Sequence, residues 1–295
     1  MIEITFPDGT KKKYEKGIKI SEILKGLPEF VQQEAIAAKV DDKLVDLTAE
    51  IDSNATLQIL TFRDPEGVEI FRHSSAHLMA EAVTELYPYA KLTIGPVVDE
   101  GFYYDIDHEP FTPENIIEIE KKMKEIINRK TPIIRKEITK KEALELFKDN
   151  EYKLEMINEL GDTEEVISVY EQGKFADLCR GPHVPHTGKI KSFKLTKIAG
   201  AYWRADAKNK QLQRIYGISF RDKKDLKQYL HVLEEAKKRD HRELGKKLEL
   251  FSFHDHGKGL PFFHPKGMII WNELLDFWRE EHKKGGYVEI KTPLI

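Results

Sequence analysis

Residues 2–9 read IEITFPDG, and this stretch decides how the first domain is built. Its apolar residues alternate with polar ones up to the proline, which is typical of a strand with one buried face. The Pro-Asp-Gly that follows supplies turn residues, so a second strand is expected near Lys13-Tyr14. Ser21 stands where a helix N-cap belongs, ahead of a short apolar face. The stretch therefore predicts a strand pair followed by a helix.

Three more strands are expected further along, at 35–40, 44–47 and 56–62. Strand–strand–helix–strand–strand, closed by the strand at 56–62, is in a unit of this length the order of a β-grasp (ubiquitin-like) fold. We therefore predict a β-grasp domain over residues 1–62. Its linker is expected near 63–67, where Pro65 and Gly67 interrupt the pattern.

The rest of the chain predicts an α+β multidomain protein. Runs of strands and runs of helices replace each other without the strict alternation of a doubly wound sheet. The expected elements of a second domain, residues 63–224, are a helix at 72–87, strands within 91–106, a long charged helix at 113–130, a short helix at 140–149 and a β-rich part at 166–216. A charged linker helix is expected at 225–247, and an apolar, aromatic segment, residues 248–295, follows it as an incomplete domain.

Composition excludes several classes of protein. The chain has 48 basic and 51 acidic residues, so its net charge of −3 does not predict nucleic-acid binding by itself. One cysteine among 295 residues excludes a disulfide framework and a cysteine-rich zinc module. We find no signal peptide and no apolar run long enough to span a bilayer. We therefore expect a cytoplasmic protein without a membrane partner.

Two pairs of residues carry the chemistry. His73 and His77 are four apart on the helix expected at 72–87, which places them side by side on one face. Cys179 and His183 are also four apart, but prolines at 182 and 185 disfavour a helix and predict a kinked loop. Each pair alone is a weak signal. Together they are typical of a zinc tetrad, a Cys–His nucleophile or a metal-free site that activates water.

A basic stretch lies between residues 189 and 214, where eight basic residues meet one acid. Aromatic residues at 193, 202, 203 and 216 interleave with them, as in surfaces that bind nucleic acid. The alternative is that Phe193 and Trp203 belong to the core and the lysines only solvate a strand edge. The candidate RNA-binding residues are Lys189, Lys191, Lys194, Lys197 and Arg204.

Four motifs resemble those of a known family. They read HSSAH from His73, GPVVDEGFYYD from Gly95, DLCRGPHVP from Asp177 and AGAYWR from Ala199. In this order they resemble the N-terminal half of threonyl-tRNA synthetases. The resemblance covers the whole chain: a β-grasp (TGS) domain, an editing domain, and, from Gly267, motif 1 of a class II antiparallel-sheet catalytic domain with its Pro293.

The resemblance implies a threonine–tRNA ligase whose second domain hydrolyses seryl-tRNA(Thr). Serine lacks one methyl group of threonine, which is worth only about 1–3 kcal/mol of discrimination, so a separate editing site is needed. The family's catalytic positions map to His73, His77, Lys153, Cys179 and His183, and its substrate-binding positions map to Tyr104, Tyr170 and Asp177. We expect His73 and Lys153 to activate water, Asp177 to hold the seryl ammonium group, and Cys179 and His183 to contact the terminal ribose.

The resemblance also implies cofactors and partners. We expect no metal for editing, although His73, His77, Cys179 and His183 would be the ligands of one. ATP, Mg and Zn would serve the parent enzyme through residues beyond 295, so the chain given is expected to edit and not to ligate. The partners are tRNA(Thr) and, through motif 1, a second copy in a homodimer. Two alternatives stay open: a free-standing zinc-dependent deacylase of the alanyl type, and a non-catalytic RNA-binding module.

Overall fold

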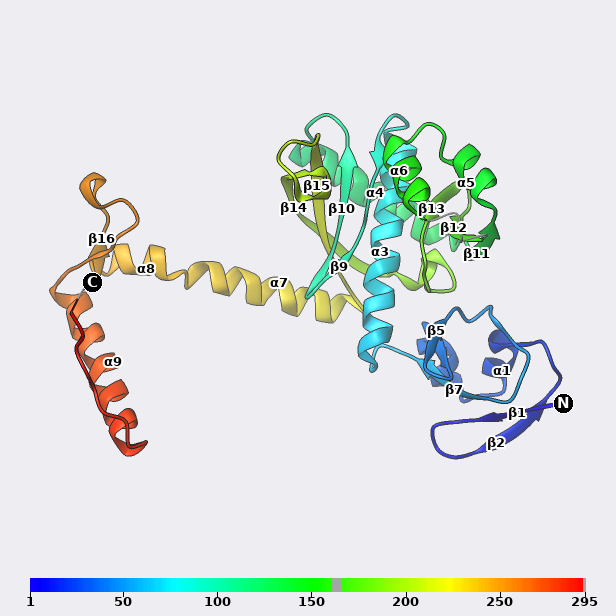
Figure 1. Cartoon of the computed structure of the whole chain (residues 1–295), viewed down its shortest axis with the longest axis horizontal. Helices are drawn as coiled ribbons and strands as arrows, with labels where there is room; N and C mark the ends of the chain where they lie inside the picture. The colour runs from blue at the N-terminus through cyan, green and yellow to red at the C-terminus, as the bar shows by residue number, and fades with distance from the viewer. Residues whose placement is uncertain (161–165, 294–295) are drawn as a thin grey trace. The chain divides into compact units, whose positions relative to one another are not determined.

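The structure is a computed structural model that describes residues 1–160 and 166–293. The chain divides into two compact units, Met1–Leu226 and Lys227–Ile295. Figure 1 shows the elements of both units, coloured along the chain from blue to red. The first unit holds the predicted β-grasp domain and the α+β domain, and so contains every residue of the candidate site.

The β-grasp prediction is confirmed. The sheet has the order β2-β1-β7-β4-β5, with β1 parallel to β7 and antiparallel to β2. Its apolar face, which includes Ile4 and Leu57, packs against Ile23 of α1, and all three residues are nearly inaccessible to solvent. The elements are β1 (Ile2–Thr5), β2 (Lys11–Tyr14), β3 (Ile18–Lys19), α1 (Ile20–Lys25), α2 (Glu29–Glu34), β4 (Ala37–Val40), β5 (Lys43–Val45), β6 (Glu50–Ile51) and β7 (Ala55–Leu60).

Two local expectations in this domain were wrong. Ser21 is not the N-cap of α1, because the helix already begins at Ile20 and the N–H group of Ser21 donates to the carbonyl of Leu47. Residues 29–34 form helix α2, which begins directly after Pro28 and was not expected. A proline fixes its own φ near the helical value and needs no N–H partner, so a helix starts readily beside it.

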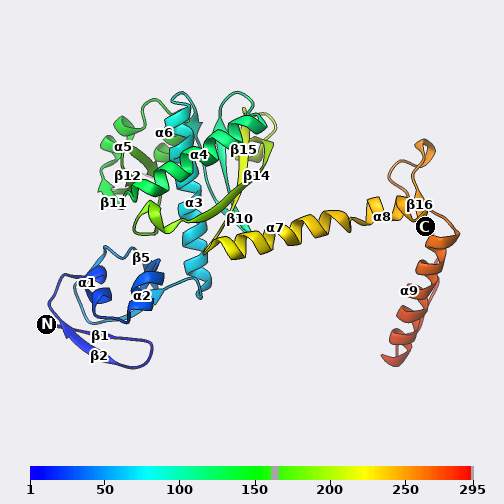
Figure 2. The ribbon, with the colours of Figure 1, turned by 180° about the vertical axis from the view of Figure 1, so that it is seen from behind.

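The α+β domain is built around one long helix, α3 (Pro65–Leu86). The sequence predicted its start at residue 72, within what is in fact its second turn. Pro65 occupies the first turn, where a missing N–H costs nothing, so residues 65–67 of the expected linker are helical instead. Figures 1 and 2 show α3 standing between two sheets, with β10, β14 and β15 on one side and β11, β12 and β13 on the other.

The two sheets and their helices surround the site. One sheet has the order β14-β15-β10-β8 with β9 beside β10, and the other has the order β11-β12-β13. The remaining elements are β8 (Lys91–Leu92), β9 (Val97–Val98), β10 (Gly101–Asp107), α4 (Pro113–Arg129), β11 (Ile133–Ile138), α5 (Lys140–Leu146), α6 (Glu151–Glu159), β12 (Ile167–Gln172), β13 (Phe175–Leu178), β14 (Ser192–Tyr202) and β15 (Gln211–Phe220), with short 3-10 turns at Thr187–Lys189 and Trp203–Ala205. Side chains of α3, α4 and both sheets share one hydrophobic core.

The segment after residue 222 differs from the single linker helix that was expected. It forms α7 (Lys223–Lys238) and α8 (His241–Lys247), because Asp240 adopts a non-helical conformation and its side chain caps the second helix. A hairpin of β16 (Phe251–Ser252) and β17 (Phe262–Phe263) and helix α9 (Pro265–Lys284) follow. The last two residues of the stretch that resembles motif 1, 294 and 295, lie outside the described residues. None of the helices within the described ranges is both long and apolar enough to cross a membrane.

Candidate active site

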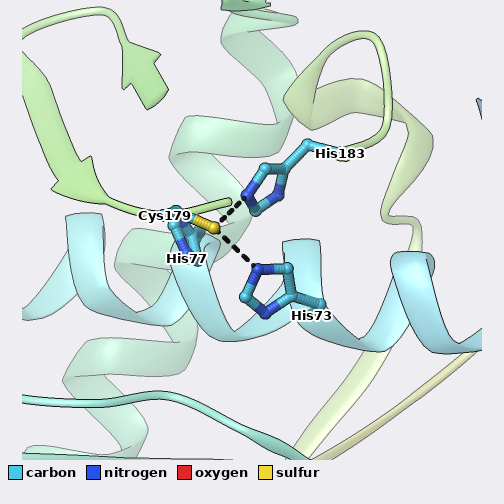
Figure 3. Close-up of side chains that lie close together, drawn as sticks. All are labelled: His73, His77, Cys179 and His183. Atoms are coloured by element: carbon cyan, nitrogen blue, oxygen red, sulfur yellow. Dashed lines mark hydrogen bonds between the residues drawn. The ribbon is translucent and has the colours of Figure 1, made fainter. Parts of the chain in front are cut away.

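The two pairs of candidate residues meet although about a hundred positions separate them. His73 and His77 project from α3, and Cys179 and His183 come from the irregular loop that follows β13. Their ligand atoms all lie within 4.8 Å of one another. Figure 3 shows the sulfur of Cys179 between the rings of His73 and His183. The loop prediction for residues 179–183 is therefore confirmed.

Hydrogen bonds fix the orientation of the His183 ring. The hydroxyl of Ser74 donates to the carbonyl of Ile70 (2.8 Å), so its oxygen accepts from the backbone N–H of Val184 (3.0 Å) and from Nδ1–H of His183 (3.0 Å). The Nε2 atom of His183 is then an acceptor, and it lies 3.3 Å from Sγ of Cys179. The thiol therefore has a base within reach.

His73 faces the same sulfur atom. Its Nε2 lies 3.0 Å from Sγ of Cys179, and the backbone N–H of Gly181 also donates to that sulfur (3.2 Å). The thiol has one proton, so it can donate a hydrogen bond to only one of the two imidazoles that face it. His73 is also the more exposed of these two rings, while His183 is buried. His73 is thus the imidazole that a water molecule can reach most directly.

Burial sets the charge of all four side chains. It lowers the pKa of His73 and holds those of His77 and His183 well below the usual value for histidine. It raises the pKa of the Cys179 thiol to about 12. At neutral pH the imidazoles are therefore uncharged and the thiol keeps its proton. Because the thiolate is the reactive form of cysteine, this environment does not favour the Cys–His nucleophile.

A buried ion pair lies beside the cluster. Nζ of Lys153, on α6, is 2.5 Å from Oδ1 of Asp177, and both side chains are about 3% exposed. Oδ2 of Asp177 accepts from the hydroxyl of Tyr104 (2.5 Å) and lies 3.7 Å from Nε2 of His77. The backbone N–H of Leu178 donates to Oδ1 (2.8 Å). Asp177 thus has four partners, counting His77, and it could take up a seryl ammonium group only by giving up one of them.

Tyr170 forms the wall behind the loop. Its ring centroid lies 4.4 Å from that of His183, and its hydroxyl donates to Oδ2 of Asp46 in the β-grasp domain (2.7 Å). A Cβ atom added at Gly181, where φ is +66°, would lie 1.8 Å from the Tyr170 hydroxyl oxygen. Glycine is therefore required at this position by both the backbone angle and the closeness of the tyrosine.

Two hollows reach the site from the surface. One, of about 390 Å³, is lined by Cys179 and Arg180 together with residues of α6 and β12. The other, of about 280 Å³, is lined by Lys153 and Asp177. The larger hollow falls within the range of pockets that hold small ligands, about 300–1,000 Å³. The thiol and the ion pair can thus be approached from two sides.

The four donors would also suit a metal. Three imidazole nitrogens and one sulfur are a zinc-like set, and separations of 3.0 and 3.3 Å around the sulfur resemble those between ligands of a tetrahedral ion. The Ser74 hydroxyl would hold the far nitrogen of His183, as residues behind metal ligands do. The residues therefore fit zinc in type, and the most widely separated donors would have to move closer together to share one ion.

The five predicted RNA-binding residues are not part of the histidine–cysteine cluster, and most of them have partners within the domain. Arg204 pairs with Glu155 and Glu159, and Lys194 pairs with Glu120, so both are engaged within the domain. Of the other three, Lys189 donates to the backbone of residue 33, Lys197 lies over the ring of Tyr216, and Lys191 is exposed. The aromatic residues at 193 and 203 are buried, as the alternative interpretation of this stretch expected.

Sequence reasoning missed two features of the site. Ser74 orients His183 and lies inside the HSSAH motif, so its position between the two histidines was the available signal. Helix α6, which carries Lys153, was not expected either. Asn150 caps it by accepting from the N–H groups of residues 152 and 153, and an asparagine before a helical pattern is a recognised start signal.

Comparison with known proteins agrees with this architecture. Residues 2–61 match the TGS domain, and residues 167–216 match the threonyl and alanyl tRNA synthetase second additional domain. Proteins named threonine–tRNA ligase are 55% identical in Desulforapulum autotrophicum, 53% in Desulfatibacillum aliphaticivorans and 54% in Clostridium botulinum (strain Loch Maree). Each match covers 100% of this chain but only 46–47% of the relative, so the chain spans about half the length of these proteins. The chain belongs to the threonyl-tRNA synthetase family and corresponds to its N-terminal region.

Proposed function

We propose that the α+β domain hydrolyses the ester of mischarged aminoacyl-tRNA, with seryl-tRNA(Thr) as its substrate. The observation that carries the proposal is the convergence of three uncharged imidazoles on the Cys179 thiol, with the buried ammonium group of Lys153 beside them on Asp177. An ester hydrolase needs a base for water, a positive or hydrogen-bonding group for the oxyanion, and an acid for the leaving hydroxyl. The site contains side chains suited to all three tasks.

In the proposed reaction, neutral His73 accepts a proton as water attacks the ester carbonyl. Lys153 has three N–H donors, and in the described part of the chain Asp177 takes one and the Tyr104 hydroxyl, at 3.5 Å, a second. The third is free to stabilise the developing oxyanion. The C–O bond to the ribose then breaks, protonated His73 returns its proton to the 2′ or 3′ oxygen, and serine leaves as the carboxylic acid, which loses its remaining proton to bulk water.

The remaining site residues would shape the pocket. Cys179 lines the larger hollow and shares a hydrogen bond with His183, and both would contact the terminal ribose. Tyr104 and Tyr170 are buried and would form the walls. Asp177 would orient Lys153 and His77, and would bind the seryl ammonium only if one of its present partners gave way.

We propose that editing proceeds without a metal, because Lys153 supplies the positive charge that zinc would otherwise provide. The fit of the four donors to zinc makes a zinc-dependent deacylase the second candidate. If the second candidate is right, the purified chain carries about one equivalent of zinc and a chelator abolishes hydrolysis. If the proposal is right, chelation leaves the rate unchanged.

The test is deacylation of seryl-tRNA(Thr) and threonyl-tRNA(Thr) by the purified chain. Replacing the base, His73→Ala, should lower hydrolysis about 10²–10⁴-fold while the chain still binds tRNA. His231→Ala, on exposed α7, is a matched control that should not change the rate. RNA binding that falls with salt, with no hydrolysis of either ester, would support the RNA-binding module instead.

We further infer that the full-length protein joins threonine to tRNA(Thr), because the relatives that cover the whole chain are named threonine–tRNA ligases. ATP, Mg and Zn would be the cofactors of that reaction. Helix α9 exposes large apolar side chains, among them Ile269, Leu274 and Phe277 at 63–65%, which is consistent with a homodimer through motif 1. Ligation would be tested on the full-length protein, and the expectation for residues 1–295 is hydrolysis alone.

A further inference from the structure

The β-grasp domain contributes one side chain to the neighbourhood of the active site. Asp46 directly follows β5, and its carboxylate accepts two hydrogen bonds from the α+β domain. Oδ2 accepts from the hydroxyl of Tyr170 (2.7 Å), and Oδ1 accepts from the backbone N–H of His183 (2.9 Å). The residues joined in this way are 124 and 137 positions apart in the chain.

Both partners of Asp46 hold the catalytic loop. Tyr170 packs against the ring of His183 and leaves no room for a side chain at residue 181. His183 is fixed at its backbone by Asp46 and at its ring by Ser74. Removing the carboxylate would release the tyrosine and one of the two anchors of the histidine.

The segment that presents Asp46 is itself anchored in the β-grasp core. Leu47 is 5% exposed and packs with that core, and its carbonyl accepts from the backbone N–H of Ser21. The Asp46 side chain is partly buried, and the positive charge of Arg135 on β11 acts on its carboxylate. Hydrogen bonds to a charged, buried acceptor are stronger than those between neutral groups. The carboxylate is therefore held in a fixed position and is not a mobile surface group.

We propose that Asp46 is a positioning residue, through which the β-grasp domain holds the 179–183 loop in its active geometry. Only the expected change in the rate of hydrolysis rests on the proposed function; the positioning of the loop does not. In this arrangement the β-grasp domain completes the editing site and is not merely an appended module. A disturbance of the contact between the two domains would then alter the rate of hydrolysis without touching any group that contacts the substrate.

The test uses the whole chain and two independent readouts. The first is the steady-state hydrolysis of seryl-tRNA(Thr), separated into kcat and KM. The second is the rate at which iodoacetamide alkylates Cys179, which is the only cysteine of the sequence. This thiol is hydrogen-bonded to His73, to His183 and to the loop backbone, so its accessibility reports on the loop even without tRNA.

Asp46→Ala removes both acceptors and should lower kcat roughly tenfold or more, with KM little changed, and should speed alkylation by a similar factor. Asp46→Asn should have a smaller effect, because its carbonyl can still accept from His183 while its amide faces Tyr170. Asp52→Asn changes an exposed acid of the same domain and should match the wild-type chain in both readouts. Tyr170→Phe keeps the ring, and combining it with Asp46→Asn should add less than the sum of the two effects.

The outcomes separate this inference from the proposed function. If the wild-type chain hydrolyses the ester and Asp46→Ala behaves like Asp52→Asn in both readouts, the positioning role is overturned and the hydrolase stands. If the wild-type chain hydrolyses nothing, the proposed function fails, and the alkylation rates alone decide whether Asp46 holds the loop. If Asp46→Ala does not fold, the double-mutant cycle of Asp46→Asn and Tyr170→Phe decides the question, and strict additivity counts against the proposal.

Discussion

The buried pair of Lys153 and Asp177 gives the sharpest prediction about stability. Lys153→Met leaves the carboxylate of Asp177 at about 3% exposure with no cation beside it. Removing one member of a buried ion pair costs about 3–5 kcal/mol, because the remaining charge stays out of water without compensation. Asp177→Leu should cost a similar amount, because the ammonium group is left behind and Tyr104 loses its acceptor.

The double variant distinguishes pairing from simple packing. Lys153→Met with Asp177→Leu removes both charges and leaves mainly the Tyr104 hydroxyl and the Leu178 N–H unsatisfied, at a cost of about 1–3 kcal/mol each. The double variant should therefore lose less stability than the sum of the two single variants, by several kcal/mol. Lys148→Met, which breaks an exposed pair with Glu145, is the control and should hardly shift the unfolding midpoint.

Urea unfolding followed by Trp203 fluorescence measures these differences. Trp203 packs against Tyr152, the residue before Lys153, so it reports on the part of the chain that contains the pair. The other two tryptophans, Trp271 and Trp278, lie on α9 and are replaced by phenylalanine in the background of every variant. If the losses of the two single variants add strictly in the double variant, the pair does not hold the site together and the reasoning is refuted.

Three further predictions concern single residues. Burial raises the pKa of Glu81 to about 7, so between about pH 4.5 and 7 the folded state binds more protons than the unfolded state, and the free energy of unfolding should fall as pH rises through that window. Thermal unfolding of Glu81→Gln should lack this pH dependence. If the variant keeps the pH profile of the wild-type chain, Glu81 is not the group responsible. Gly181→Ala should destabilise the chain and stop hydrolysis, because the added Cβ meets Tyr170. Gly9 has a similar φ but open space around it, so Gly9→Ala should cost only the backbone strain of about 1–2 kcal/mol and keep full activity. Equal effects of the two substitutions in melting and activity assays would count against the close contact. Cys179→Ala should reduce hydrolysis by no more than about tenfold, the worth of one hydrogen bond, because the protonated thiol is not the nucleophile; a complete loss of turnover in a folded variant would restore the nucleophile interpretation.

The sequence predicted the parts of the site that follow local rules. Helical periodicity placed His73 and His77 on one face, and two prolines placed Cys179 and His183 on a loop, as the structure has them. The alternation in residues 2–6 predicted the first strand of the β-grasp sheet. Each of these inferences needs only neighbours within a few positions, where backbone preference and spacing decide the outcome.

The features that the sequence did not predict depend on contacts between distant segments. The pairing of Lys153 with Asp177 arises because α6 packs beside β8 and β13 ends nearby, and a single sequence contains no signal for such packing. The bonds from Asp46 to Tyr170 and His183 depend on how one domain meets another. The start of α3 was misplaced for a local reason, since Pro65 suggested a linker although proline is also favourable in the first turn of a helix.

The central claim is that the cluster around Cys179 cleaves an aminoacyl ester. Single-turnover release of labelled serine from seryl-tRNA(Thr), with wild-type chain and His73→Ala compared in the presence of a chelator, tests it most directly. We predict rapid release by the wild-type chain, slower release from threonyl-tRNA(Thr), and a loss of about 10²–10⁴-fold in the variant. Equal rates for the wild-type chain and the variant, or no release while tRNA is bound, would contradict it.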